Sequence, residues 1–179
     1  MRLFIALDLK ELEPYFKKLQ AQLPEDVSKL KLVNTFHLTL KFLGETDKAD
    51  EIILALQKIK VPELKLTLTN IGVFPSESYV RVIWVGLKEN KQLMQLQKDI
   101  ESALEPFHFR KDFEFLPHLT LARVKFISNK QDFLERLKNI KVEPKEIILK
   151  EFKLIKSELT KEGPVYTDLS IFQQPLHES

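Results

Sequence analysis

The hydrophobic and polar positions along the chain predict strands and helices in alternation. A continuous apolar run over residues 3–9 predicts a buried strand, and apolar residues at helical spacing over 12–23 predict a helix that Pro24 closes. A second strand over 32–43 and a second helix over 52–59 follow. Leucines that alternate with polar residues over 64–68 predict a half-buried strand. The first half therefore has the order strand–helix–strand–helix–strand.

The same order of elements returns in the second half. Apolar patterns predict a strand over 80–87, a helix over 93–104 and a strand over 115–124. Ser128-x-x-Gln131 has the form of a capping box that opens the next helix. A strand over 147–155 follows, with a bulge where its apolar phase slips after Leu149, and a last strand covers 165–172. Residues 74–78 and 161–164 are predicted to form a loop and a turn.

Matching positions in the two halves are separated by nearly constant distances along the chain. Arg2 precedes Arg81 by 79 residues, His37 precedes His118 by 81, and the third strands are offset by 80. A constant offset over three elements indicates an internal duplication. We therefore expect one bilobal domain over 1–179, with halves of roughly 1–79 and 80–172. The predicted fold is α+β, with two pseudo-symmetric duplicated lobes, each an antiparallel sheet backed by helices, and a central active-site cleft.

Composition narrows the classes of function. The 179 residues are 44% hydrophobic and 30% charged with a net charge of +2, which is typical of a globular protein without a whole-surface footprint for long nucleic acid. A short phosphate-bearing ligand in a local basic cleft remains open. The absence of cysteine excludes disulfides and thiolate chemistry. Without a signal-like start or an apolar run of about 18 residues, we expect a cytoplasmic monomer with no membrane partner.

The tetrapeptide His-Leu-Thr-Leu occurs twice, at 37–40 and at 118–121. Residues i and i+2 of a strand point to the same face, so each imidazole shares a face with its threonine hydroxyl. Two histidines are fewer than the three or four ligands of a metal site, and neither tetrapeptide supplies the nucleophile and carboxylate of a serine-type triad. Two opposed imidazoles with an ordinary pKa of about 6.5 suit proton transfer in both directions. Threonine hydroxyls can donate to non-bridging oxygens. The pattern predicts in-line attack at phosphorus with neither metal nor cofactor.

These residues and their neighbours resemble a known family. The resemblance rests on the segments 2–7, 37–44, 72–75, 81–86, 117–123 and 163–166. The paired His-x-Thr motifs resemble the 2H phosphoesterase superfamily. The flanking Lys-Phe-Leu-Gly and Leu-Ala-Arg resemble its RNA 2′,3′-cyclic phosphodiesterase branch, also labelled 2′-5′ RNA ligase. The resemblance implies that an RNA 2′,3′-cyclic phosphate end is opened to a 2′-phosphomonoester, with reversible 2′-5′ joining of RNA ends by the same path and no nucleotide cofactor.

The resemblance also implies roles for individual residues. His37 is the general acid and His118 the general base, although the pseudo-symmetry allows the opposite assignment. Thr39 and Thr120 bind the phosphate. Strict alternation turns Arg123 away from these residues, but a bulge or the strand end returns it, and the resemblance implies that it holds the phosphate; the alternative is a solvated arginine at a strand end.

Further residues have two interpretations each. Alternation places Lys41 on the face of His37, where it either steers RNA phosphates or is an ordinary solvated lysine. Phe74 and Tyr166 are candidates for stacking on a terminal base, whereas Phe42 and Trp84 are expected in the core. Arg81 could line the cleft, while His108 is expected to be structural and His177 lies in the tail. Two other functions stay open: another 2H activity (a 2′-5′ oligonucleotide phosphodiesterase or an RNA exonuclease), or a non-catalytic module that binds RNA ends or nucleotides.

Overall fold

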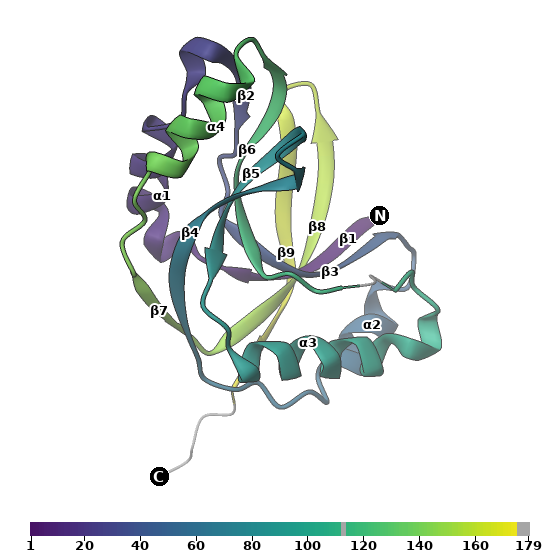
Figure 1. The fold of residues 1–179 in the computed structure, drawn as a ribbon. Coiled ribbons are helices and arrows are strands. Elements are labelled where there is room, and N and C mark those ends of the chain that lie inside the picture. Colours follow the sequence, from purple (N-terminus) through teal and green to yellow (C-terminus); the bar gives the residue numbers. More distant parts are fainter. Residues whose placement is uncertain (112–113, 175–179) are drawn as a thin grey trace.

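Two antiparallel sheets meet near the middle of the molecule, as the computed structural model shows for residues 1–111 and 114–174 (Figure 1). The smaller sheet has the order β3-β1-β8-β9, and the larger has the order β2-β6-β5-β4-β7. The strands of the smaller sheet are β1 (Arg2–Asp8), β3 (His37–Glu45), β8 (Glu151–Thr160) and β9 (Gly163–Gln173). Those of the larger are β2 (Ser28–Leu32), β4 (Leu64–Ser76), β5 (Tyr79–Leu87), β6 (His118–Ile127) and β7 (Glu146–Leu149).

Four α-helices complete the two lobes. They are α1 (Glu13–Ala21), α2 (Ala49–Leu56), α3 (Lys91–Leu104) and α4 (Lys130–Asn139), with 3-10 turns at Lys10–Leu12, Glu25–Val27 and Glu105–Phe107. The order β1-α1-β3-α2-β4 repeats as β5-α3-β6-α4-β7. This confirms the expected α+β fold with duplicated lobes. No helix in the described part of the chain is long and apolar enough to cross a membrane.

The third strand of each half crosses to the sheet of the other half. β4 follows the first His-x-Thr strand but pairs with β5 of the second half, and β8 pairs with β1 of the first half. The strand predicted over 147–155 is therefore wrong as a single bulged element. It is two strands, β7 and β8, interrupted at Lys150, and they belong to different sheets. The apolar phase slips at this point because each strand faces a different sheet.

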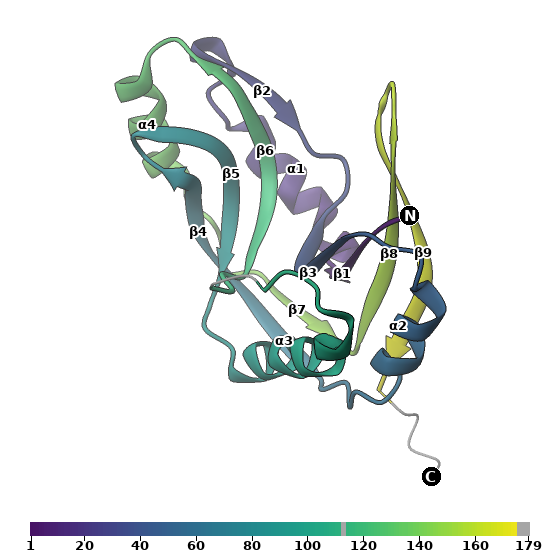
Figure 2. The same cartoon turned by 90° about the vertical axis from the view of Figure 1, so that its right-hand side faces the viewer.

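One hydrophobic core covers a single face of each His-x-Thr strand. Leu38 and Leu119 have no exposed surface, and they pack in the same core as Phe16 and Phe133 of α1 and α4. Alternation leaves His37 and His118 on the other side, which we call the accessible face of each strand. Figure 2 shows the two sheets meeting where β3 and β6 contact each other and separating above that junction.

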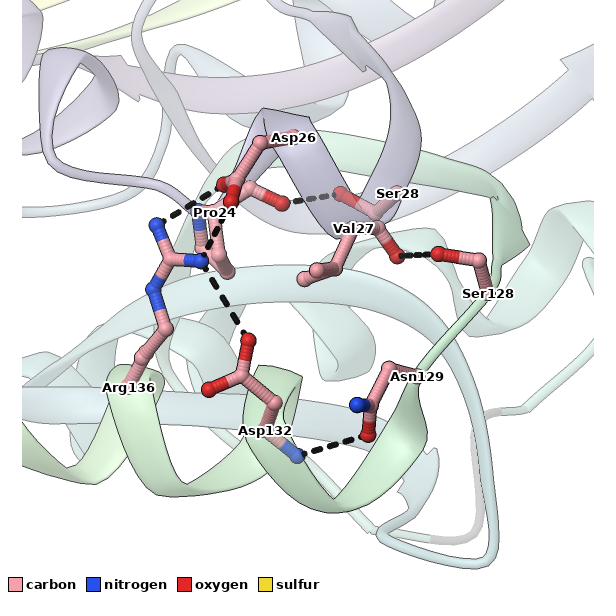
Figure 3. Close-up of polar contacts among 8 residues, drawn as sticks. All are labelled: Pro24, Asp26, Val27, Ser28, Ser128, Asn129, Asp132 and Arg136. Carbon is pink, nitrogen blue, oxygen red and sulfur yellow. Dashed lines mark hydrogen bonds and ion pairs between the residues drawn. The ribbon is translucent and has the colours of Figure 1, made fainter.

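Three local expectations are corrected by the structure. The strand β2 was not predicted, because its alternation of lysine and leucine is short and its leucines are only half-buried. The N-cap of α4 is Asn129, whose side chain accepts from the Asp132 amide at 3.1 Å, whereas the Ser128 hydroxyl donates to the Val27 carbonyl at 3.0 Å (Figure 3). Residues 74–76, expected in a loop, end β4.

Candidate active site

A bulge interrupts each of the two His-x-Thr strands at the same place. In β3 the pairing with β1 slips between Thr39 and Lys41, so that Leu40 is the extra residue. In β6 the pairing with β5 slips between Thr120 and Ala122, so that Leu121 is the extra residue. The extra residue inverts the alternation beyond it, because two residues of the bulged strand then oppose one of its partner. The duplication therefore includes the irregularity as well as the motif.

The bulge in β6 brings Arg123 onto the accessible face. His118 pairs with Gly86, Thr120 with Trp84 and Arg123 with Val82, so all three share one face. The burial pattern agrees, because Arg123 is exposed while its neighbours Ala122 and Val124 are buried. A bulge is one of the two devices by which the sequence allowed Arg123 to reach this face.

The bulge in β3 has the opposite consequence for Lys41. It turns Lys41 into the core face, where the residue is 2% exposed. Its Nζ lies 2.8 Å from Oε1 and 2.9 Å from Oε2 of Glu101 on α3, and it donates to the Arg110 carbonyl at 3.1 Å. The expectation that Lys41 shares the face of His37 is therefore wrong, as is its assignment to substrate binding. Phe42, expected in the core, takes the accessible position and is 62% exposed.

Helices of opposite halves support the two bulges at equivalent positions. Gln20 on α1 donates from Nε2 to the carbonyl of the bulged Leu121 at 2.9 Å, and also to the Val33 carbonyl at 2.9 Å. Glu101, which lies 81 residues after Gln20, binds Lys41 beside the other bulge. A bulge leaves backbone groups outside the sheet ladder, and buried groups of this kind need a partner. Gln20 supplies that partner in β6.

His37 lies among aromatic side chains. Its ring centroid is 5.8 Å from that of Phe4 on β1 and 5.5 Å from that of Tyr166 on β9, both edge to face. Phe4 also lies 6.1 Å from Phe42. Phe4, Ala6 and Ile155, with Tyr166 packed against them, form a second small hydrophobic cluster on the side of the smaller sheet away from the core. Tyr166, a candidate for base stacking, thus contacts the first histidine directly.

Charged groups also surround His37. Nζ of Lys153 lies 3.0 Å from Asp8 and 2.9 Å from Asp168, which links β1, β8 and β9. Burial lowers the pKa of His37 below its usual value, and Lys153 adds to this, while Asp8 and Asp168 oppose it. Burial would raise the pKa of Asp8, but the Lys10 amide and Lys153 more than offset it, so that pKa is lowered. Sequence reasoning missed this group, because its members lie on three strands far apart in the chain.

His118 has a different environment. Its Nδ1 lies 2.7 Å from the Leu116 carbonyl, and because a carbonyl only accepts, Nδ1 carries the hydrogen. The neutral ring then has its free electron pair on Nε2. The His118 ring lies 4.8 Å from Phe74 and 6.2 Å from Trp84, centroid to centroid. Trp84, expected in the core, is half-buried and lies on this face.

The remaining candidates lie as follows. Phe74, expected in a loop, lies on β4 against His118, so it reaches the site from a strand. Arg81 is exposed, with its guanidinium carbon 5.6 Å from the ring centroid of Tyr79. His108 has left-handed backbone angles after a 3-10 turn and is exposed, while His177 lies outside the described residues. Among residues 1–111 and 114–174 there is no group of three or more His, Asp or Glu that could hold a metal ion.

Comparison with known proteins gives a consistent picture. The family described as LigT like Phosphoesterase matches this chain twice, over residues 7–84 and 85–166. A Methanocaldococcus jannaschii protein named RNA 2′,3′-cyclic phosphodiesterase is 39% identical over 168 residues, which cover 93% of this chain and 96% of that protein. A Thermotoga maritima protein of the same name is 33% identical over 176 residues, covering 93% and 91%.

Solved structures agree with these relatives. The crystal structure of the Thermus thermophilus protein TT0787 has a TM-score of 0.81 at 28% identity, covering 97% of this chain and 98% of that one. The crystal structure of Escherichia coli LigT complexed with 3′-AMP has a TM-score of 0.73 at 26% identity, covering 96% of each chain.

Proposed function

The chain belongs to the LigT-like phosphoesterase family, and from this premise we propose that it hydrolyses RNA 2′,3′-cyclic phosphate ends to 2′-phosphomonoesters. One observation carries the proposal. Two His-x-Thr pairs occupy the accessible faces of contacting strands, and a bulge adds Arg123 to one of them. Two proton-transfer groups with hydroxyl and guanidinium donors are the equipment for displacement at phosphorus.

The proposed reaction moves two protons. His118 takes a proton from water through Nε2 as the water oxygen attacks phosphorus. The bond from phosphorus to O3′ breaks, and His37 gives a proton to O3′, which leaves the phosphate on O2′. The hydroxyls of Thr39 and Thr120 and the guanidinium of Arg123 hold the non-bridging oxygens, where negative charge increases in the transition state.

The structure supports this division of roles by the environments of the two rings. The bond from Nδ1 to the Leu116 carbonyl leaves Nε2 of His118 free to accept a proton. Burial lowers the pKa of His37 in the free protein, so its imidazole is biased toward the neutral form there. A phosphate anion beside it favours the protonated form, so that His37 takes up its proton as substrate binds. An analogue with sulfur in place of the 3′ bridging oxygen separates acid from base, because a thiolate leaves without a proton. It should rescue His37→Ala but not His118→Ala.

The test uses 2′,3′-cyclic AMP in the presence of EDTA, with separation of 2′-AMP from 3′-AMP. We expect 2′-AMP, and a loss of roughly 10²- to 10⁴-fold in kcat/KM for each of His37→Ala and His118→Ala. The double variant should be little worse than either single variant, because the histidines act as a unit. His108→Asn is the matched control, since asparagine tolerates the left-handed backbone there. No turnover, 3′-AMP as product, or turnover only without EDTA would each refute the proposal.

The same path run in reverse joins RNA ends. An RNA 5′-hydroxyl in place of water attacks the cyclic phosphate, and a 2′-5′ linkage forms with the same two histidines. We propose this as a secondary activity of the site. It requires that His37→Ala and His118→Ala remove ligation together with hydrolysis, and ligation that survives either substitution would show that another site is responsible.

A further inference from the structure

Three neighbouring strands of the larger sheet carry positive charge only. β2, β6 and β5 contain five basic residues and no Asp or Glu: Lys29, Lys31, Arg81, Arg123 and Lys125. All five are exposed, and within residues 1–111 and 114–174 none belongs to an ion pair. The four strands of the smaller sheet hold four basic and five acidic residues. The near-neutral chain therefore has a strongly positive region on one of its two sheets.

The register places part of this charge on the face of the second histidine. Lys31 pairs with Arg123 and Lys29 with Phe126, and a second slip in the pairing makes Lys125 an extra residue. Lys29, Lys31 and Phe126 therefore share the accessible face with Arg123. From His118 to Phe126 this face extends roughly 20 Å, at about 3.3 Å per residue with two bulges.

Exposed aromatic rings lie among these basic residues. Phe126 is 62% exposed and Tyr79, at the start of β5, is 60% exposed. Tyr79 pairs with Ser76, at the hairpin end of β4 and β5, and the Arg81 guanidinium lies over its ring. Large exposed rings between basic side chains are typical of surfaces that bind unpaired nucleotides, because every base has a face that stacks.

We propose that this basic strand face, made of Lys29, Lys31, Arg81, Tyr79 and Phe126 and continuous with Arg123, binds the single-stranded RNA that leads into the cyclic phosphate end. The proposal rests on the proposed function for the position of the reacting end and goes beyond it by assigning a site for the body of the substrate. Lysines and arginines bind the phosphates in any sequence, and the rings select unpaired over paired bases.

The strand that carries two of these lysines is anchored independently of them. Asp26, just before β2, forms an ion pair with Arg136 of α4 at 2.8 Å, and the Ser28 hydroxyl donates to the Pro24 carbonyl at 2.6 Å (Figure 3). The side chains of Lys29 and Lys31 take no part in these contacts and are exposed. Their replacement by alanine therefore leaves the strand in place.

The experiment compares two substrates in the full chain. One is 2′,3′-cyclic AMP, and the other is a single-stranded oligoadenylate that ends in a 2′,3′-cyclic phosphate. Lys29→Ala/Lys31→Ala should keep kcat/KM for the mononucleotide and lose it for the oligonucleotide at low salt. Each lost phosphate contact on a single strand lowers the slope of log(kcat/KM) against log[salt] by about 0.7, so the wild-type advantage should shrink about seven-fold between about 50 and 200 mM salt. Lys91→Ala/Lys98→Ala, which removes two exposed lysines from α3, is the matched control and should behave as wild type.

The outcomes separate this inference from the proposed function. If wild type opens both substrates and the Lys29/Lys31 variant matches it at every salt concentration, the basic strand face does not bind RNA although the function stands. If wild type opens neither, the function fails, and fluorescence anisotropy with a 2′-phosphate-ended oligoadenylate still tests the surface. Equal losses in the α3 control would overturn the assignment to this face, as would binding of duplex RNA as tight as that of the single strand.

Discussion

The buried ion pair between Lys41 and Glu101 allows a quantitative test of how the first bulge is supported. The Lys41 side chain is 1% exposed and that of Glu101 is 24% exposed. Glu101→Ala leaves the Lys41 ammonium with only the Arg110 carbonyl at 3.1 Å. Removing one partner of a buried pair costs about 3–5 kcal/mol, and the partial exposure of Glu101 places the expected cost near the lower end, at about 3 kcal/mol.

The corresponding change in Tm follows from chain length. At about 2.1 cal/mol/K per residue, the 179 residues give an unfolding entropy of about 0.38 kcal/mol/K near 60 °C, so 1 kcal/mol changes Tm by about 2.7 °C. Glu101→Ala should therefore lower Tm by about 8 °C. Lys41→Met should lower it by less than about 3 °C, because methionine fills the apolar stem and Glu101 keeps water and the Gln97 amide at 3.2 Å. The double variant should resemble Lys41→Met.

Calorimetry and steady-state kinetics together decide the matter. The burial of Lys41 on the core face predicts that Lys41→Met keeps kcat/KM for 2′,3′-cyclic AMP well below Tm. A Tm for Glu101→Ala within about 2 °C of wild type would refute the reasoning from burial. A ten-fold loss of kcat/KM in Lys41→Met at unchanged Tm would mean that Lys41 contacts the substrate.

Three further predictions concern the site and its support. Gln20→Leu leaves the Leu121 carbonyl unpaired, which should cost about 1–3 kcal/mol in thermal unfolding and lower kcat/KM through displacement of the β6 bulge; an unchanged kcat/KM would separate the bulge from catalysis. Gly72→Ala would place a Cβ 2.2 Å from the Trp84 ring, so we expect a shift in tryptophan emission and a lower kcat/KM, and neither change would occur if the ring moves freely. The lowered pKa of Asp8 stabilises the fold above pH of about 4 and ceases to do so as the pH falls through its folded value; Asp8→Asn should therefore weaken urea resistance at pH 7 but not at pH 2, and an equal loss at both would exclude this linkage.

Local patterns predicted what depends on near neighbours in the chain. The apolar phases indicated the duplicated order of elements, and the repeated tetrapeptide indicated which residues share an accessible face. The bulges were harder, since one extra residue decides that Arg123 lies on this face and that Lys41 does not. A bulge was named as a possibility for Arg123 but was not applied to the equivalent position of the first half, and there the prediction failed.

Long-range pairing could not be predicted from these patterns. The exchange of third strands depends on partners far apart in the sequence, such as β1 with β8. The pairing of Lys153 with Asp8 is a consequence of that exchange, because β8 brings the lysine beside β1. A search for charged residues at alternate positions of the predicted strands would have found both, but nothing local links them.

The exchange of strands also explains how two identical motifs acquire different environments. Each tetrapeptide lies in a strand that the duplication reproduced together with its bulge, yet its neighbours come from segments that differ. β8 and β9 bring Lys153, Asp168 and Tyr166 to His37, so ionised groups control the protonation of that ring. β4 brings Phe74 to His118, and a backbone carbonyl fixes the tautomer there. Opposite proton roles require such a difference, and it arises outside the tetrapeptides, in the strands that cross between the lobes.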